Sequence, residues 1–231
     1  MIDIHNHILF GVDDGAKSLE ESLKMLKAAK KQGINTVIAT PHFYSFDTDI
    51  ESLKQKVEKS YEILCESIND DLPTVYLGYE LHYFNGIYKS ELVKELTLNK
   101  GKYLLLELDH DDITDNVIRN IEEIRWQLDL KPIIAHVERY NKCKGYKKLL
   151  KIFDHENYFA QITADSLFDN KFKKVSINLI KKGLVDFIAS DAHDCDARGF
   201  MLKEAYDFIA NKFNKQIANS FISNTQNLFS R

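Results

Sequence analysis

The sequence is poor in cysteine, proline and glycine. Its 231 residues include three cysteines, three prolines and nine glycines. The cysteines are odd in number and lack the regular spacing of a protein held together by disulfides; they are Cys65, Cys143 and Cys195. This pattern excludes a disulfide scaffold and indicates a reducing compartment. No linker rich in proline, glycine or serine and no low-complexity segment marks a domain boundary. We therefore expect a single domain over residues 1–231.

Long apolar runs and an excess of positive charge are also absent. No apolar run is long enough to span a bilayer, and no basic and apolar leader segment is recognisable. The net charge of −4 argues against nucleic acid and anionic membranes as partners, because both require a basic face. We therefore expect a cytoplasmic protein without membrane insertion. A substrate that carries phosphate is still compatible with this net charge, because bound cations or a few arginines make the local charge inside a site positive.

The sequence does contain a repeated alternation of short β-branched runs and longer charged segments with helical spacing. Ser18 and Glu21 predict a capping box for the first helix, and Gly33 predicts its end. The strand candidates are 2–4, 35–40, 73–80, 102–108, 131–137, 158–163 and 185–190, and the helix candidates are 18–33, 49–68, 114–130 and 198–213. Such alternation predicts an α/β fold with a parallel sheet that is buried on both faces.

Polar side chains that can bind protons or metals follow most of these strand candidates. They are His5, His7, His42, Glu80, Glu107, His136, Asp191 and His193. The carboxyl ends of the strands in a parallel barrel meet on one face, where active sites of this architecture lie. This placement favours a closed barrel over an open, doubly wound sheet.

The spacing and the types of these residues predict a metal centre. His5 and His7 are two positions apart, so they project from the same face of an extended strand, and Asp191 and His193 repeat this spacing. Several buried carboxylates are costly to bring together unless cations neutralise them. Imidazole and carboxylate without thiolate suit manganese, iron or zinc. Roughly nine ligands are more than one ion uses, so we expect two or three ions.

Other polar residues are expected to have structural roles. His82, His110 and His155 follow no repeated pattern and are not expected to bind metal, although His82 and His110 can line the mouth of the site. Asp3 is expected to orient a histidine from outside the ligand set. Cys195 is not expected to be a nucleophile, because "CDAR" is too short to form a loop that cradles phosphate.

The segments "DIHNH", "TPH", "GYELH", "AHVERY" and "ASDAH" occur in this order and resemble the polymerase and histidinol phosphatase (PHP) superfamily of metal-dependent phosphoesterases. The closer resemblance, through "DIHNHILFGVDDGAKSLEES" and "PIIAHVERY", is to its bacterial manganese-dependent protein-tyrosine phosphatases of capsular and extracellular polysaccharide biosynthesis. It covers essentially the whole chain. The resemblance implies that residues 1–231 form one phosphatase domain, a distorted (β/α)7 TIM-like barrel.

The resemblance also implies a site with three groups of metal ligands. The first is His5, His7, Glu80 and Asp191; the second is Glu80, Glu107 and His136; the third is Asp14, His42 and His193. Arg139 and Arg198 match the phosphate-binding arginines of the family. Mn²⁺ is the expected metal, with iron and zinc as alternatives.

The implied activity is hydrolysis of a phosphomonoester by attack of a metal-bound hydroxide on phosphorus. Asp191, His193 or Glu107 is expected to move the proton. The expected partner is a phosphotyrosine protein, namely the C-terminal tyrosine cluster of a bacterial tyrosine kinase, and an oligomer is compatible with the sequence. The alternatives are a phosphatase of small molecules such as histidinol phosphate, and a metal-binding module without catalysis. Short segments after the strands favour an open rim and a peptide substrate.

Overall fold

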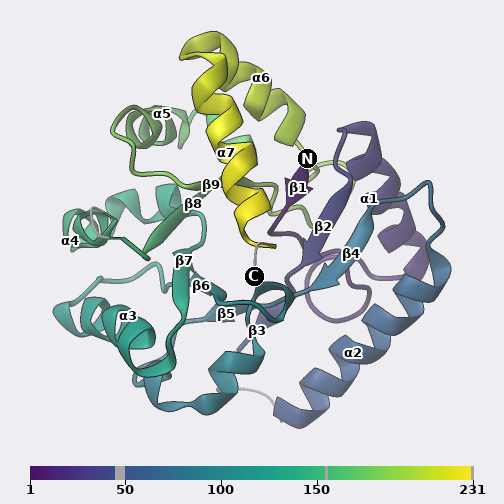
Figure 1. The fold of residues 1–231 in the computed structure, drawn as a ribbon, viewed down its shortest axis with the longest axis horizontal. Helices are drawn as coiled ribbons and strands as arrows, with labels where there is room; N and C mark the ends of the chain where they lie inside the picture. The colour runs from purple at the N-terminus through teal and green to yellow at the C-terminus, as the bar shows by residue number, and fades with distance from the viewer. Residues whose placement is uncertain (45–49, 154–155, 230–231) are drawn as a thin grey trace.

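The computed structural model describes residues 1–44, 50–153 and 156–229. Parallel strands form the centre, and helices surround them (Figure 1). The strands are β1 (Ile2–Asp3), β2 (Thr36–Ala39), β3 (His42–Phe43), β4 (Thr74–Leu77), β5 (Glu80–His82), β6 (Tyr103–Glu107), β7 (Lys131–Ile134), β8 (Phe159–Thr163) and β9 (Phe187–Ala189). The helices are α1 (Leu19–Lys31), α2 (Ile50–Ser67), α3 (Asp115–Leu128), α4 (Tyr146–Ile152), α5 (Lys173–Lys181), α6 (Leu202–Lys212) and α7 (Lys215–Asn227).

The strands make a distorted seven-stranded barrel, as predicted, in which two of the seven are broken in the middle. Strand order is β1-β2-β4 in one part and β3-β5-β6-β7-β8-β9 in the other, with every pair parallel. β2 and β3 are halves of one strand that is interrupted at Pro41, which has no N–H to donate. β4 and β5 are likewise separated by two residues, and the Glu80 N–H donates to the Pro41 carbonyl at 3.1 Å.

The barrel closes between its first and last strands. Asn6 and Ala192 form a parallel bridge just beyond β1 and β9. The Asp191 N–H donates to the His5 carbonyl, and the His7 N–H donates to the Ala192 carbonyl, both at 2.8 Å. Closure therefore depends on backbone bonds made by residues that belong to the predicted metal centre.

Side chains alternate between the barrel interior and the helix layer. Leu105, Ile133, Phe187 and Ala189 lie in an inner apolar cluster, whereas their strand neighbours pack against the helices. Because the strand period is two, the next inward position after Leu105 is Glu107, and Asp191 follows β9 two residues after Ala189. The interior therefore changes from apolar to ionisable at the carboxyl ends of the strands.

Most helix predictions are confirmed to within a few residues. The Ser18 side chain caps α1 by accepting from the Glu21 N–H at 3.3 Å, and Gly33 follows α1 with a left-handed φ of 78°. The helix predicted over 198–213 begins only at Leu202, because the Asp194 carboxylate accepts from the Arg198 N–H at 3.0 Å and holds this segment in a turn. Among the described residues, no helix is both long and apolar enough to cross a membrane.

Asp186, at the opposite end of β9 from the ionisable cluster, is expected to limit stability at neutral pH. Its carboxylate accepts from the Ala160 N–H at 2.9 Å, and burial raises its pKa to about 6. The native state therefore holds this proton more tightly than the unfolded chain, and stability falls as pH rises from about 4 to above 6. Asp186→Asn keeps the acceptor oxygen and removes the charge. We expect it to raise the free energy of unfolding by about 1–2 kcal/mol at pH 7.5.

Urea denaturation at pH 7.5 and pH 4 tests this, with Asp70→Asn at an exposed loop position as the matched control. The gain should become much smaller at pH 4, where Asp186 is protonated in the native state and the native state therefore buries no charge at this position. An equal gain at both pH values, or an equal gain in the control, would contradict the role given to the buried charge.

Candidate metal centre

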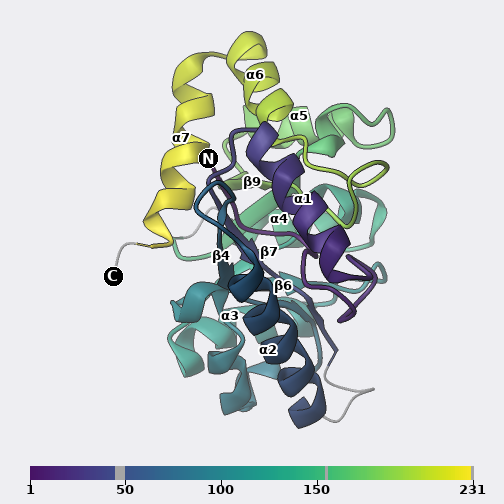
Figure 2. The ribbon, with the colours of Figure 1, turned by 90° about the vertical axis from the view of Figure 1, so that its right-hand side faces the viewer.

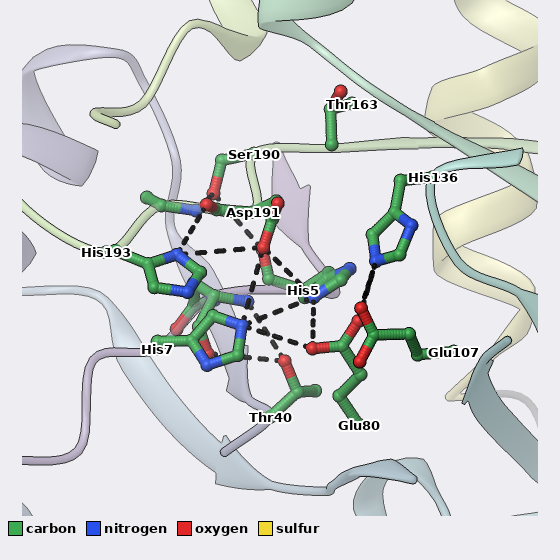
Figure 3. A network of polar contacts seen from close by, with 12 residues as sticks. His5, His7, Thr40, Glu80, Glu107, His136, Thr163, Ser190, Asp191 and His193 are labelled. Carbon is green, nitrogen blue, oxygen red and sulfur yellow. Dashed lines mark hydrogen bonds and ion pairs between the residues drawn. The ribbon is translucent and has the colours of Figure 1, made fainter. Parts of the chain in front are cut away.

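The carboxyl ends of the strands bring most of the predicted ligands together, and Figure 3 shows His5, His7, Glu80, Glu107, His136, Asp191 and His193 in this cluster. Parallel pairing places His42 beside Glu80, and His82 beside Glu107, in register. His5 and His7 extend from β1, and Asp191 and His193 follow β9. The donor atoms form three groups, each with its atoms within 4.8 Å of one another: His5, His7, Glu80 and Asp191; His7, Asp14, His42 and His193; and His42, Glu80 and Glu107.

Glu80 lies at the middle of this cluster. Its Oε2 is 3.2 Å from His5 Nε2, 3.3 Å from His7 Nε2 and 2.9 Å from His42 Nδ1. Its Oε1 is 3.0 Å from His136 Nε2, which is also 3.4 Å from an oxygen of Glu107. Glu80 and His42 each belong to two of the three groups, whereas His136, which was expected with Glu80 and Glu107, lies beside both carboxylates but in none of the groups.

Asp14 comes from the loop after β1 and approaches from the outer side. Its Oδ1 is 3.2 Å from His193 Nε2 and 3.6 Å from His42 Nε2. The adjacent Asp13 points elsewhere, since its Oδ2 lies 2.7 Å from His7 Nδ1 and accepts from the His42 N–H at 3.1 Å. The two neighbouring aspartates thus have different roles, one facing the cluster and one orienting His7.

The loop that carries both aspartates returns against β1 because residue 15 is glycine. A Cβ at Gly15 would lie 2.0 Å from the His7 carbonyl oxygen and 2.5 Å from the His7 Cβ. Any other residue would push this loop away from His7. The sequence "DDGA" therefore encodes a close backbone approach as well as two carboxylates.

Three histidines direct their Nε2 atoms toward carboxylate oxygens or one another. The Nδ1 of His5 faces the Gln161 amide oxygen at 3.0 Å, that of His7 faces Asp13, and that of His193 faces the Asp191 carbonyl oxygen at 2.9 Å. These acceptors assign the ring proton to Nδ1, which leaves a lone pair on each Nε2. Lone pairs that face carboxylate oxygens repel unless a proton or a metal cation lies between them.

Buried atoms without hydrogen bonds support this conclusion. Glu80 Oε2, His42 Nδ1 and His193 Nε2 are buried and, among the described residues, meet no partner in hydrogen-bond geometry, although such atoms in proteins are almost always paired. All three belong to the groups of convergent donors. The site therefore fits divalent cations bound by imidazole and carboxylate.

The electrostatics of the cluster show how strongly it requires positive charge. Burial alone would lower the pKa of His7, but Asp13, Asp191 and Glu80 outweigh burial and raise that pKa well above its usual value. Burial would raise the pKa of Glu80, but the surrounding histidines hold it well below its usual value. Burial and the charge on His7 lower the pKa of His193 to about 4. Because metal-binding histidines must be neutral, cations would displace protons from His7.

Two predicted ligands have backbone conformations that are rare outside glycine. φ is 33° at His136 and 53° at Asp191, both in the left-handed region. Such conformations are costly and occur most often at functional sites. Here each follows directly from the end of a barrel strand and turns a side chain toward the cluster.

Arg139 and Arg198 lie at one edge of the cluster and share a carboxylate. The Arg139 guanidinium bonds Asp191 Oδ2, and Arg198 Nη2 donates to the same oxygen at 3.2 Å. Arg198 Nη1 also lies 3.4 Å from Asp14 Oδ2. The remaining donors of both forks are available to an anion beside the metal groups.

Gln161 of β8 is a polar residue of the site that the sequence analysis missed. It is completely buried, and its Oε1 contacts His5 and accepts from the His136 N–H at 3.1 Å. It therefore orients two predicted ligands at once. A lone amide within the apolar run "YFAQIT" is the only sequence signal for it.

The structure corrects the role expected for Asp3. Asp3 accepts from the Ser190 N–H at 2.9 Å, from the Ser190 hydroxyl at 2.6 Å and from Asn6 Nδ2 at 3.1 Å. None of these three hydrogen bonds involves a histidine side chain. Asp3 thus fixes the closure of the barrel instead of a ligand.

The histidines not expected to bind metal lie at or outside the rim. His82 bonds Glu107 at 3.2 Å and Asp109 at 2.9 Å, and the His110 ring lies near those of His136 and Tyr140. His155 lies outside the described residues. Cys195 is an exposed free thiol.

Comparison with known proteins places this geometry in a family. The profile described as "Capsular polysaccharide synthesis, CpsB/CapC" matches residues 1–230. The chain belongs to the CpsB/CapC family.

CpsB/CapC relatives of this chain carry names that state an activity. The tyrosine-protein phosphatase CpsB of Streptococcus agalactiae is 32% identical over 247 residues, covering 99% of this chain and 98% of the relative. The tyrosine-protein phosphatase YwqE of Bacillus subtilis is 34% identical over 237 residues, covering 98% and 90%.

A solved CpsB/CapC structure has the same fold. It comes from work on YwqE of Bacillus subtilis and CpsB of Streptococcus pneumoniae, described as metal-dependent tyrosine phosphatases. Its TM-score with this chain is 0.85 at 30% identity, and the match covers 99% of this chain and 94% of that one. The predicted barrel of the PHP type is thereby confirmed.

Proposed function

We propose that this chain is a metal-dependent protein-tyrosine phosphatase that acts in capsular or extracellular polysaccharide synthesis. The names of its CpsB/CapC relatives support this activity. We propose further that residues 1–231 work as one cytoplasmic phosphatase domain, with Mn²⁺ as the metal. The substrate we propose is a phosphotyrosine protein, namely the C-terminal tyrosine cluster of a bacterial tyrosine kinase.

One observation carries the proposal: two arginines meet on a carboxylate that also faces the convergent histidines. Arg139 and Arg198 share Asp191 Oδ2, while Asp191 Oδ1 lies 3.3 Å from His5 Nε2 and 3.4 Å from His7 Nε2. A site that only stored cations would gain nothing from two guanidinium groups beside them. A phosphate anion matches both kinds of partner.

The metal ligands in this proposal are His5, His7, Asp14, His42, Glu80, Glu107, His136, Asp191 and His193. Divalent cations held there would supply a nucleophile at neutral pH and neutralise part of the phosphate charge. Arg139 and Arg198 bind the non-bridging oxygens and stabilise the charge that spreads over them. Asp191 positions both guanidinium forks.

The proton requirements of the reaction fit a phosphotyrosine substrate. A phenolate leaves readily, so a strong acid beside the leaving oxygen is unnecessary. Asp191 and His193 are the proposed groups for holding or moving a proton on the nucleophile side. His193 Nδ1 donates to the Asp191 carbonyl oxygen at 2.9 Å, which fixes the ring with Nε2 toward Asp14.

Phosphate release from three substrates tests the proposal: p-nitrophenyl phosphate, a phosphotyrosyl peptide and histidinol phosphate, each with Mn²⁺ and with EDTA. We expect release from the first two with Mn²⁺, and a loss of at least about 10³-fold with EDTA. Preference for histidinol phosphate would assign the site to small molecules. Tight metal binding without release from any substrate would make the protein a binding module.

A further inference from the structure

A charged groove opens beside the metal centre on the side of the two arginines. Its volume is about 690 Å³, and its lining includes Arg139, Asp191 and Arg198 at one end. Lys24, Lys27 and Lys31 of α1 line it further out. The groove is therefore continuous with the proposed phosphate site and leads away from it along α1.

The three lysines lie on one face of α1. Their spacing of three and four residues places successive side chains on the same side of a helix. α1 runs along one flank of the barrel, below α6 (Figure 2). Gln32, at the end of α1, donates to the Glu204 carboxylate and accepts from the Lys203 N–H, both at 3.0 Å. These bonds fix α1 against the start of α6 and hold the lysine row beside the groove.

The three lysines make no strong ion pair with other residues that the structure describes. Lys27 and Lys31 are exposed and form no ion pair with other residues that the structure describes. Lys24 pairs with Glu20 at 2.9 Å on the helix surface, where both side chains are more than half exposed. Such exposed pairs are weak and exchange readily for another anion. Although its net charge is −4, the protein thus presents along this groove one weakly paired lysine, Lys24, and two lysines without an ion pair among the described residues, Lys27 and Lys31.

The acidic residues of the groove do not cancel this charge. Asp191 is already paired with both arginines. Asp165 and Asp196 also line the groove, so three lysines and two arginines face three carboxylates. The surplus is positive and lies on the α1 side.

We infer that this groove binds the peptide that flanks the phosphotyrosine, and that Lys24, Lys27 and Lys31 select acidic side chains in it. The inference rests on the proposed phosphatase function. Lys24 and Lys31 are about 10 Å apart along the helix, which is the length of about three residues of extended peptide. The length of the row therefore matches the spacing of carboxylates on neighbouring residues of an extended peptide.

Two pairs of phosphotyrosyl peptides test this. In each pair, three glutamates on the N-terminal or C-terminal side of the phosphotyrosine are compared with three glutamines. We expect wild-type kcat/KM to be about five- to tenfold higher for the glutamate member of one pair. Lys27→Glu/Lys31→Glu should abolish or reverse this preference and leave p-nitrophenyl phosphate hydrolysis unchanged. High salt should weaken the wild-type preference.

Lys30→Glu is the matched control, because Lys30 is exposed on the same helix but does not line the groove. It should keep the preference. Equal turnover of all four peptides by wild type would overturn the inference and leave the phosphatase function standing, as would an equal loss in Lys30→Glu. Failure to hydrolyse both the peptides and p-nitrophenyl phosphate would overturn both.

Discussion

Glu80→Gln is expected to lower phosphatase activity by at least about 10³-fold and to reduce the metal content of the purified protein. Glu80 is completely buried and approaches four histidines, His5, His7, His42 and His136, at 2.9–3.3 Å. Glutamine has nearly the same shape but carries no charge, and one of its two terminal atoms is a donor. A donor directed at an imidazole lone pair cannot bridge two cations.

Metal analysis alongside p-nitrophenyl phosphate hydrolysis measures the effect. Glu66→Gln, at an exposed position of α2, is the control and should behave as wild type. Thermal unfolding in EDTA separates loss of metal from loss of fold, because the variant should remain folded without metal. Full activity and full metal content in Glu80→Gln would rule out the bridging role.

Arg139→Ala is expected to lower kcat/KM for aryl phosphates by about 10²–10³-fold and to keep the metal content. The Arg139 side chain is three-quarters buried and its guanidinium contacts Asp191, so it is held in place before the substrate arrives. Preorganised donors of this kind stabilise charge that develops in the transition state. Arg139→Lys should recover little, since an ammonium cannot bond two oxygens as a fork.

Steady-state kinetics on p-nitrophenyl phosphate and a phosphotyrosyl peptide, with metal analysis of each variant, measures this loss. Arg119→Ala, at an exposed position of α3, provides the comparison. If Arg139→Ala lost metal in proportion to activity, Arg139 would hold the centre together instead of binding phosphate.

The features of the fold and the site that were predicted correctly are those that follow from sequence patterns with a short period. His5 and His7 share a face because an extended chain repeats every two residues, and the same rule brings Glu107 inward. The number of strands and their parallel order follow from the alternation of apolar runs with helices. These features depend on neighbours in sequence, which is why residue patterns reveal them.

The features that were missed depend on contacts between distant residues. Gln161 is polar within an apolar strand, and its role follows only from its contacts with His5 and the His136 N–H. Asp3 sits close to two histidines in sequence, yet its partner is Ser190, across the closure of the barrel. One difference has a local cause instead: the helix predicted from Arg198 starts late because the side chain of Asp194, four positions earlier, bonds the backbone that the helix would use.

The closure of the barrel also determines when the centre can form during synthesis. Asp3 and Ser190, which bond across it, are 187 positions apart, and His5 and Asp191 lie beside them. A ribosome that adds about 5–20 residues per second needs about 10–40 s to cover this distance. During that time the first strand can pair with β2, but it lacks its second neighbour, β9, and the Asp191 carboxylate that its histidines face. We therefore expect activity to begin only after the segment with Asp191 has emerged, and we expect partly synthesised chains to be inactive.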